Sequence, residues 1–176
     1  MQQTLLAVAA VAAFAYLALG SQRSDHALEQ RGTTAAVEIA AVDLARDRMD
    51  VLMGMAFDEG DVETGALRGT PSPHTIGPDA GEGGASTYDD LDDWNGYDEA
   101  ATAAVGRGTL PFRERVTVRY VLDDVPAAPS ADATLTKEVI VTIEQVVGGA
   151  ATGRPAQASL RRVITPVALA IDHATR

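Results

Sequence analysis

The chain has 176 residues, enough for one domain of ordinary size with an extension, and a second independent domain is not expected. Its formal net charge is −11, from 25 acidic and 14 basic residues, and Lys137 is the one lysine. Because so acidic a chain repels phosphate, nucleic acid is not an expected partner. The absence of cysteine excludes disulfides, thiol nucleophiles and Cys-ligated metals.

The N-terminal segment, residues 1–22, carries no charged side chain, and residues 5–19 are continuously apolar or aromatic. A helix of this length reaches about 33 Å, comparable with the roughly 30 Å hydrocarbon core of a bilayer. Its many alanines would let copies of the helix approach closely. We therefore predict an apolar helix for a membrane or a filament core. Its candidate assembly residues are Met1, Leu5, Leu6, Val8, Val11, Phe14, Tyr16 and Leu17.

A cleavable signal peptide or a single-span anchor is the alternative interpretation of this segment. Small residues at Gly20 and Ser21 would suit a cleavage site. Signal peptides begin with basic residues, however, and the first basic residue here is Arg23, after the apolar run. Under this alternative the protein is an exported or anchored binding module whose acidic loop holds a cation or another ligand.

Residues 23–58 predict an amphipathic helix, because apolar and charged side chains recur at helical spacing. Gly20 and Gly32 each weaken a helix by about 1 kcal/mol, so we expect a bend or melted turn between the two halves. The expected apolar stripe is Val37, Ala41, Leu44, Val51 and Met55. The expected charged face is Glu38, Asp43, Arg46, Asp47 and Asp50.

Residues 59–109 predict an irregular region that is rich in Gly, Pro and acidic residues. Trp94 and Tyr97 are expected to pin its acidic part while the carboxylates stay in water. Ca²⁺ takes six to eight oxygen ligands, so this part is also a candidate Ca²⁺ loop. Both interpretations stay open, and no other cofactor is expected. The candidate ligands are Asp89, Asp90, Asp92, Asp93 and Asn95.

Residues 110–176 predict an antiparallel β domain with strands at 112–122, 137–147 and 158–165. Alternation directs one set of side chains to the core and leaves Arg and Glu to pair across strands in water. The expected core set is Val116, Val118, Tyr120, Leu122, Val139, Val141 and Ile143. The expected water-facing set is Arg115, Thr117, Arg119, Val121, Glu138, Thr142 and Glu144.

These elements together predict an α+β fold, in which a long N-terminal helix, apolar and then amphipathic, packs on a three- to four-stranded antiparallel sheet. The chain has no phosphate-binding loop and no nucleophile motif. Its histidines, His26, His74 and His173, show no spacing typical of a metal or catalytic site. An enzyme is therefore not expected.

This arrangement resembles the type IV pilin superfamily. In particular, the minor pilins of mannose-sensitive haemagglutinin pili are similar to the helix end ARDRMDVLMGMAFDE, the loop DDLDDWNGY and the strands FRERVTVRYV, KEVIVTIEQV and ASLRRVIT. The resemblance implies a subunit of an extracellular helical filament, or fimbrium, with a methylated N-terminus. It implies insertion in the inner membrane before assembly, with copies of itself and other pilin-like subunits as partners. Leu5 stands where the family has a glutamate.

Overall fold

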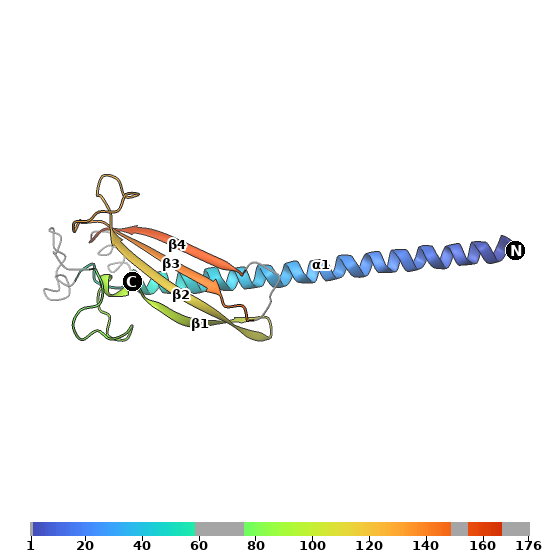
Figure 1. Cartoon of the computed structure of the whole chain (residues 1–176), viewed down its shortest axis with the longest axis horizontal. Helices are drawn as coiled ribbons and strands as arrows, with labels where there is room; N and C mark the ends of the chain where they lie inside the picture. Colours follow the sequence, from blue (N-terminus) through green and yellow to red (C-terminus); the bar gives the residue numbers. More distant parts are fainter. Residues whose placement is uncertain (1, 59–75, 149–154, 167–176) are drawn as a thin grey trace. The chain divides into compact units, whose positions relative to one another are not determined.

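A computed structural model describes residues 2–58, 76–148 and 155–166 (Figure 1). The chain divides into two compact units, Met1–Val37 and Glu38–Arg176. In chain order the elements are the helix α1 (Gln2–Leu52), the short 3₁₀ helix η1 (Asp92–Trp94) and the strands β1 (Asp98–Val105), β2 (Gly108–Tyr120), β3 (Lys137–Gln145) and β4 (Gln157–Ile164).

The first unit consists of the N-terminal part of α1. The helix runs without interruption through Gly20 and Gly32, where we predicted that it would bend or melt. Each glycine costs the helix only about 1 kcal/mol, and the surrounding alanine and leucine favour helix strongly. Among the residues that the structure describes, no helix is long and apolar enough to cross a membrane. The exposed large apolar side chains of this unit include Phe14, Tyr16, Leu17, Leu19 and Leu28.

For several of the predicted assembly residues, the side chains are not among those that the structure describes. Met1 lies outside the described residues. The backbone of Leu5, Leu6, Val8 and Val11 belongs to α1, and their side chains lie outside what the structure describes.

The second unit contains the predicted antiparallel sheet, with the strand order β1-β2-β3-β4. The predicted strands at 112–122, 137–147 and 158–165 correspond to β2, β3 and β4. The last part of α1 packs on one face of this sheet, which confirms the α+β fold with four strands. The region after β4, residues 167–176, lies outside the described part of the chain.

Strand β1 corrects the prediction that residues 59–109 are irregular. It pairs with β2 along its whole length, from Asp98 opposite Arg115 to Val105 opposite Gly108. The hairpin turn between them has two residues, and Gly106 adopts a φ of 61°, which glycine tolerates without strain. The alanine-rich strand has low intrinsic β-propensity, so its pairing with β2 sets its structure.

The buried stripe of α1 differs from the predicted one. Val51 is 46% exposed, and Leu44 and Met55 are half-buried, contrary to their expected place in the core. Two fully buried alanines, Ala41 and Ala45, stand at the centre of the observed stripe. The stripe therefore depends on small residues that a search for large apolar side chains passes over. Its members in the second unit are Ala41, Ala45, Met49 and Leu52.

The end of β2 also differs from the predicted alternation. Val121 is fully buried and Leu122 is 39% exposed, the reverse of the expected arrangement. The regular strand ends at Tyr120, and the Val121 N–H donates to the carbonyl of Thr136 (3.0 Å). The side-chain alternation therefore does not continue past Tyr120.

The other face of the sheet carries ion pairs that cross the strands, as predicted. Arg115 reaches Glu144 at 3.2 Å, and Arg119 lies directly opposite Glu138. Glu138 was expected in water, yet it is fully buried, because Arg119 and Arg161 both pair with its carboxylate and cover it. Two neighbouring cations supply the partners that a buried carboxylate requires.

Candidate functional site

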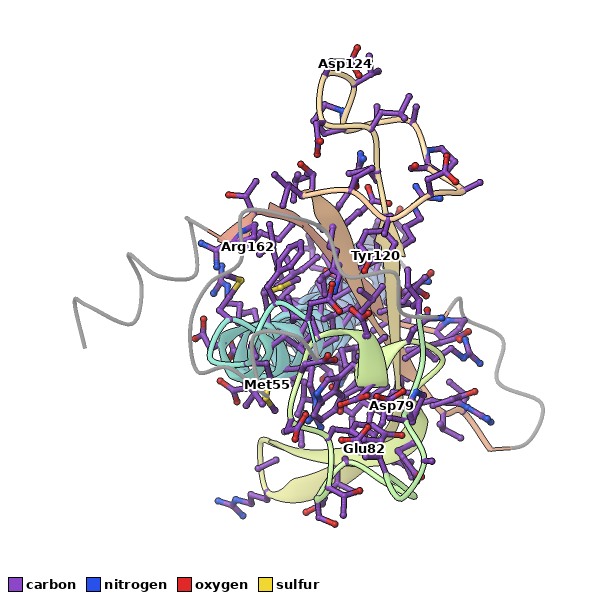
Figure 2. The ribbon with its side chains drawn as sticks, turned by 90° about the vertical axis from the view of Figure 1, so that its left-hand side faces the viewer. Met55, Asp79, Glu82, Tyr120, Asp124 and Arg162 are labelled. Carbon is purple, nitrogen blue, oxygen red and sulfur yellow. The ribbon has the colours of Figure 1, made fainter. Side chains whose placement is uncertain are left out.

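The acidic loop is joined to both the end of α1 and the sheet. The Leu91 N–H donates to the carbonyl of Ala56 (3.1 Å), just beyond the end of α1. The side-chain oxygen of Asn95 accepts from the Val118 N–H of β2 (3.1 Å). Asn95 therefore fixes the loop on the sheet, a role different from the predicted metal ligand. Figure 2 shows the side chains of this unit viewed along its helix.

Lys137, the one lysine, is fully buried beneath this loop. Its Nζ donates to Asp92 Oδ1 and to the carbonyl oxygen of Phe57. The ammonium also lies 4.4 Å from the centre of the Phe57 ring and 5.0 Å from that of Tyr120. A buried ammonium requires partners of this kind, because burial removes its hydration.

Three buried carboxylates, those of Asp58, Asp90 and Asp92, gather around Lys137, and we call them the lysine cluster. Each offers an oxygen within 4.8 Å of the other two. The Tyr120 hydroxyl donates to Asp58 Oδ2 (3.2 Å). Asp92 Oδ2 is buried without a hydrogen-bond partner among the described residues. One ammonium thus faces three carboxylates, so the cluster carries excess negative charge when all three are ionised.

Burial raises the pKa of Asp90 to about 7, and the charges of Asp92 and Asp93 contribute to the shift. Burial also raises the pKa of Asp92 to about 6, although the Lys137 ammonium opposes that shift. Both carboxyl groups can therefore take up a proton close to neutral pH. Proton uptake relieves the excess negative charge around Lys137.

A second acidic group, Glu82, Asp89 and Asp93, lies on the outer side of the loop, with carboxylate oxygens within 4.8 Å of one another. Asp93 Oδ2 accepts from the backbone N–H groups of Asp89 (3.0 Å) and Asp90 (3.2 Å). The five predicted Ca²⁺ ligands thus do not converge on one point. The structure divides their four aspartates between two groups, and Asn95 binds the β2 backbone.

The burial of the acidic loop corrects a second expectation, that its carboxylates stay in water. Asp90, Asp92 and Asp93 are 2–3% exposed. Part of the reason lies in the backbone: Asp90 Oδ1 accepts from the N–H of Asp92 (2.6 Å) and of Asp93 (3.3 Å), so the loop folds around its own carboxylates. The other reason for their burial is the ammonium of Lys137, which is distant in sequence and compensates their charge.

An arginine clamp joins α1 to the other side of the loop. Arg48 pairs with Glu114 of β2 through two nitrogens, and one of them donates to the Tyr97 hydroxyl (3.3 Å). Its guanidinium lies 4.7 Å from the centre of the Trp94 ring and 5.0 Å from that of Tyr97. Trp94 and Tyr97 therefore do pin the loop, as predicted, and they do so through a helix arginine that the sequence analysis missed.

The strand pattern contains a sign that Lys137 and Glu114 are buried, although the sequence analysis did not assign them to a site. Lys137 lies two and four residues before Val139 and Val141, and Glu114 lies two residues before Val116. Residues at even spacing in a strand lie on one face of the sheet, so both charged side chains fall on the apolar face. A charge at such a position implies a buried partner of opposite charge. The sequence does not tell which residue is that partner.

Comparisons with known proteins give no match: no family model fits the chain, and neither curated proteins nor solved structures contain a significant relative.

Replacing Lys137 with methionine should destabilise the folded protein by about 3–5 kcal/mol, because the carboxylates of the lysine cluster lose their cation. Urea unfolding at neutral pH measures the difference. The control is Arg107→Met, which removes an exposed cation from the β1–β2 turn and should change stability by no more than about 0.5 kcal/mol. Equal effects of the two substitutions would show that the ammonium has no special role.

Replacing Asp90 with asparagine should raise the stability of the variant relative to the parent protein more at pH 8 than at pH 5. The folded pKa of Asp90, about 7, lies above its unfolded value, so its contribution to stability is full below about pH 4 and is lost as the pH rises through 7. The limiting slope is about 1.4 kcal/mol per pH unit. Asparagine keeps the Oδ1 acceptor and cannot ionise. A stability difference between variant and parent that stays constant from pH 5 to pH 8 would contradict the raised pKa.

Binding of Ca²⁺ stays a prediction, and the outer group Glu82, Asp89 and Asp93 is where we would test it. Three carboxylates are fewer than the six to eight oxygens that Ca²⁺ takes, so we expect binding in the millimolar range at best. A rise in melting temperature at about 10 mM Ca²⁺, lost in Glu82→Gln and kept in the exposed control Asp132→Asn, would support it. No difference between the two variants would contradict it.

Proposed function

We propose that the protein is a structural subunit of an extracellular, type IV pilus-like helical filament. The observation that supports this proposal most strongly is the exposed apolar surface of the first unit. Phe14 is 75% exposed, Tyr16 79% and Leu17 70%. Large apolar side chains exposed in this number are candidates for contact with protein or membrane.

The two parts of α1 have different surroundings. The part in the second unit buries Ala41, Ala45 and Met49. The part in the first unit presents Phe14 and Leu17 to solvent. Removing such side chains from water yields about 1.5–3 kcal/mol each, so packing against the helices of neighbouring subunits would provide the driving force for assembly. The β-sheet unit is then the part displayed outward.

The proposed partners are other copies of this chain and other pilin-like subunits. Before assembly the same apolar helix would hold the subunit in the inner membrane. This choice follows from the resemblance to minor pilins that the sequence of the helix, loop and strand segments suggested. In this proposal the lysine cluster has a structural role, because it joins the helix, the loop and the sheet of the displayed unit.

Electron microscopy and mass spectrometry of material sheared from the cell surface test the proposal directly. We expect thin filaments that contain this chain with its N-terminal helix retained and its first residue methylated. A mature protein that begins near Ser21 would overturn the filament proposal and favour the exported or anchored binding module.

Replacing Leu17 with aspartate should abolish assembly, because burying a carboxylate among packed apolar helices costs about 3 kcal/mol per subunit. The matched control is Gln22→Asp, which places the same charge at an exposed polar position of the same helix. Filament yield is measured by sedimentation and microscopy, and circular dichroism checks that both variants keep the β-sheet. Equal filament yields from the two variants would contradict the proposed contact surface.

A further inference from the structure

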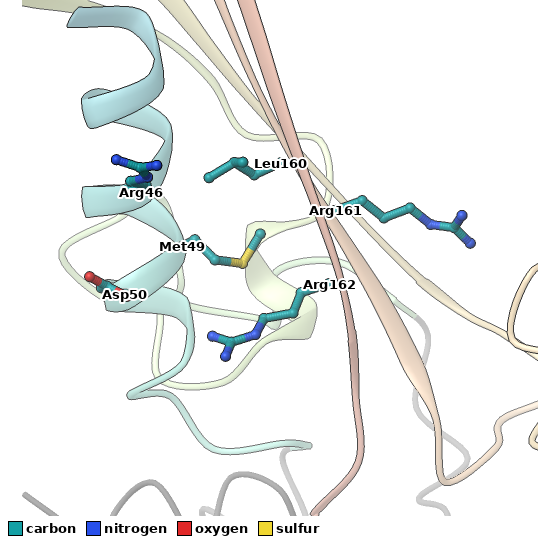
Figure 3. A pocket seen from close by; sticks show the side chains of 6 residues that line it. All are labelled: Arg46, Met49, Asp50, Leu160, Arg161 and Arg162. Atoms are coloured by element: carbon teal, nitrogen blue, oxygen red, sulfur yellow. The ribbon is translucent and has the colours of Figure 1, made fainter. Parts of the chain in front are cut away.

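A groove lies between the last turns of α1 and the edge strand β4 in the second unit, with a volume of about 330 Å³. Figure 3 shows the side chain of Met49 from the helix and that of Leu160 from the strand facing each other across it, with Arg162 also directed toward the helix. Arg161, the next residue on β4, points to the other face of the sheet. The groove thus has an apolar floor and a charged rim.

The rim of the groove has a cation available for a partner. Arg46 lies 3.7 Å from Asp43 on the helix surface, and Asp50 adds a negative charge on the same side. Arg162 is exposed and makes no ion pair with any residue in the described part of the chain. On a chain with a net charge of −11, an arginine that has no ion-pair partner among the described residues and lies beside an apolar groove favours an acidic partner that also carries an apolar side chain.

The loop between β2 and β3 has the complementary features. Val125 is 48% exposed and Leu122 is 39% exposed, and they flank Asp123 and Asp124. Both acids are exposed; Asp123 accepts from the Thr136 hydroxyl (2.6 Å), whereas Asp124 has no side-chain hydrogen bond or ion pair with the described residues. In Figure 2, Asp124 lies at the tip of the loop, away from Arg162.

Backbone hydrogen bonds hold this loop in a defined shape. The Val125 N–H donates to the Leu122 carbonyl (3.2 Å), and the Leu122 N–H donates to the Ala128 carbonyl (3.0 Å). The Ala128 N–H donates in turn to the Val125 carbonyl (2.9 Å). A preorganised loop loses little conformational entropy when it binds, which suits it to contact a preformed groove.

We propose that the α1–β4 groove receives the tip of this loop, residues 122–125, from a second copy of the chain. Val125 enters between Met49 and Leu160, and Asp124 pairs with Arg162. The groove is about twice the size of the ~150 Å³ cavity that accommodates benzene, so it has room for apolar side chains and not for a folded element. This inference rests on the proposed filament function and names one of its subunit contacts.

The groove and the loop are different surfaces, so the contact is head-to-tail. In a pair of subunits, such a contact leaves one groove and one loop unoccupied. Further subunits can therefore add, and the contact continues into a ring or an open helix. It also uses four residues of the loop, far fewer than the roughly 20–30 residues a side of a stable interface. It therefore sets the relative position of subunits whose association depends mainly on α1.

Cysteine cross-linking tests this contact without background, because the natural chain has no cysteine. Two differently tagged single variants, Val125→Cys and Leu160→Cys, are mixed, assembled and oxidised. We expect a disulfide-linked dimer that carries both tags. The matched control replaces Leu160→Cys with Val163→Cys, an exposed residue (41%) three positions further along β4. Equal or greater cross-linking through position 163 would overturn the proposal.

A charge exchange provides the second test. We expect Arg162→Glu to lower filament yield at least fivefold and the double variant Arg162→Glu, Asp124→Arg to restore it, whereas the control Arg107→Glu leaves it unchanged. Filaments with normal yield from Arg162→Glu and no 125–160 cross-link would overturn this contact and leave the filament function intact. A wild-type protein that forms no filaments in any preparation would overturn both.

Discussion

The fold of the second unit depends on the burial of one ammonium group. Lys137 contacts the carbonyl of Phe57 beyond the helix end, Asp92 in the acidic loop and the ring of Tyr120 on the sheet. These three segments are far apart in the sequence. Because an unpaired buried charge is costly, the ammonium is satisfied only when all three segments are in place. The helix end, the loop and the sheet therefore satisfy Lys137 only when all three are packed together.

The Arg48 clamp adds a second constraint of the same kind on the opposite side of the loop. Its pairing with Glu114 requires one particular face of α1 to meet the sheet, and its stacking on Trp94 requires the loop to be closed. Buried ion pairs contribute little net stability compared with apolar packing, but a wrong orientation would leave their charges unpaired.

These two constraints explain which parts of the structure could be predicted from the sequence. Strands β2, β3 and β4 follow from side-chain alternation, which is a local property. Half of strand β1 is alanine, which has low β-propensity, so only its two-residue turn at Gly106 and its partner β2 define it. The lysine cluster was missed because the ammonium that compensates the acidic loop lies 45 residues from Asp92. The carboxylates of such a loop look water-facing until that partner is known.

The charge distribution also bears on how copies of the chain could associate. Four of the described arginines of the sheet pair within their own subunit: Arg113 with Asp98, Arg115 with Glu144, and Arg119 and Arg161 with Glu138. The fifth, Arg162, makes no ion pair with the residues that the structure describes. Copies with a net charge of −11 repel one another, yet exposed charges are largely screened beyond about 8 Å at physiological ionic strength. Apolar contact through residues such as Phe14 and Leu17 is not screened by salt. At physiological ionic strength the balance therefore favours association through the helix. Arg162, which has no ion-pair partner among the described residues, would gain most from an acidic neighbour held at short range.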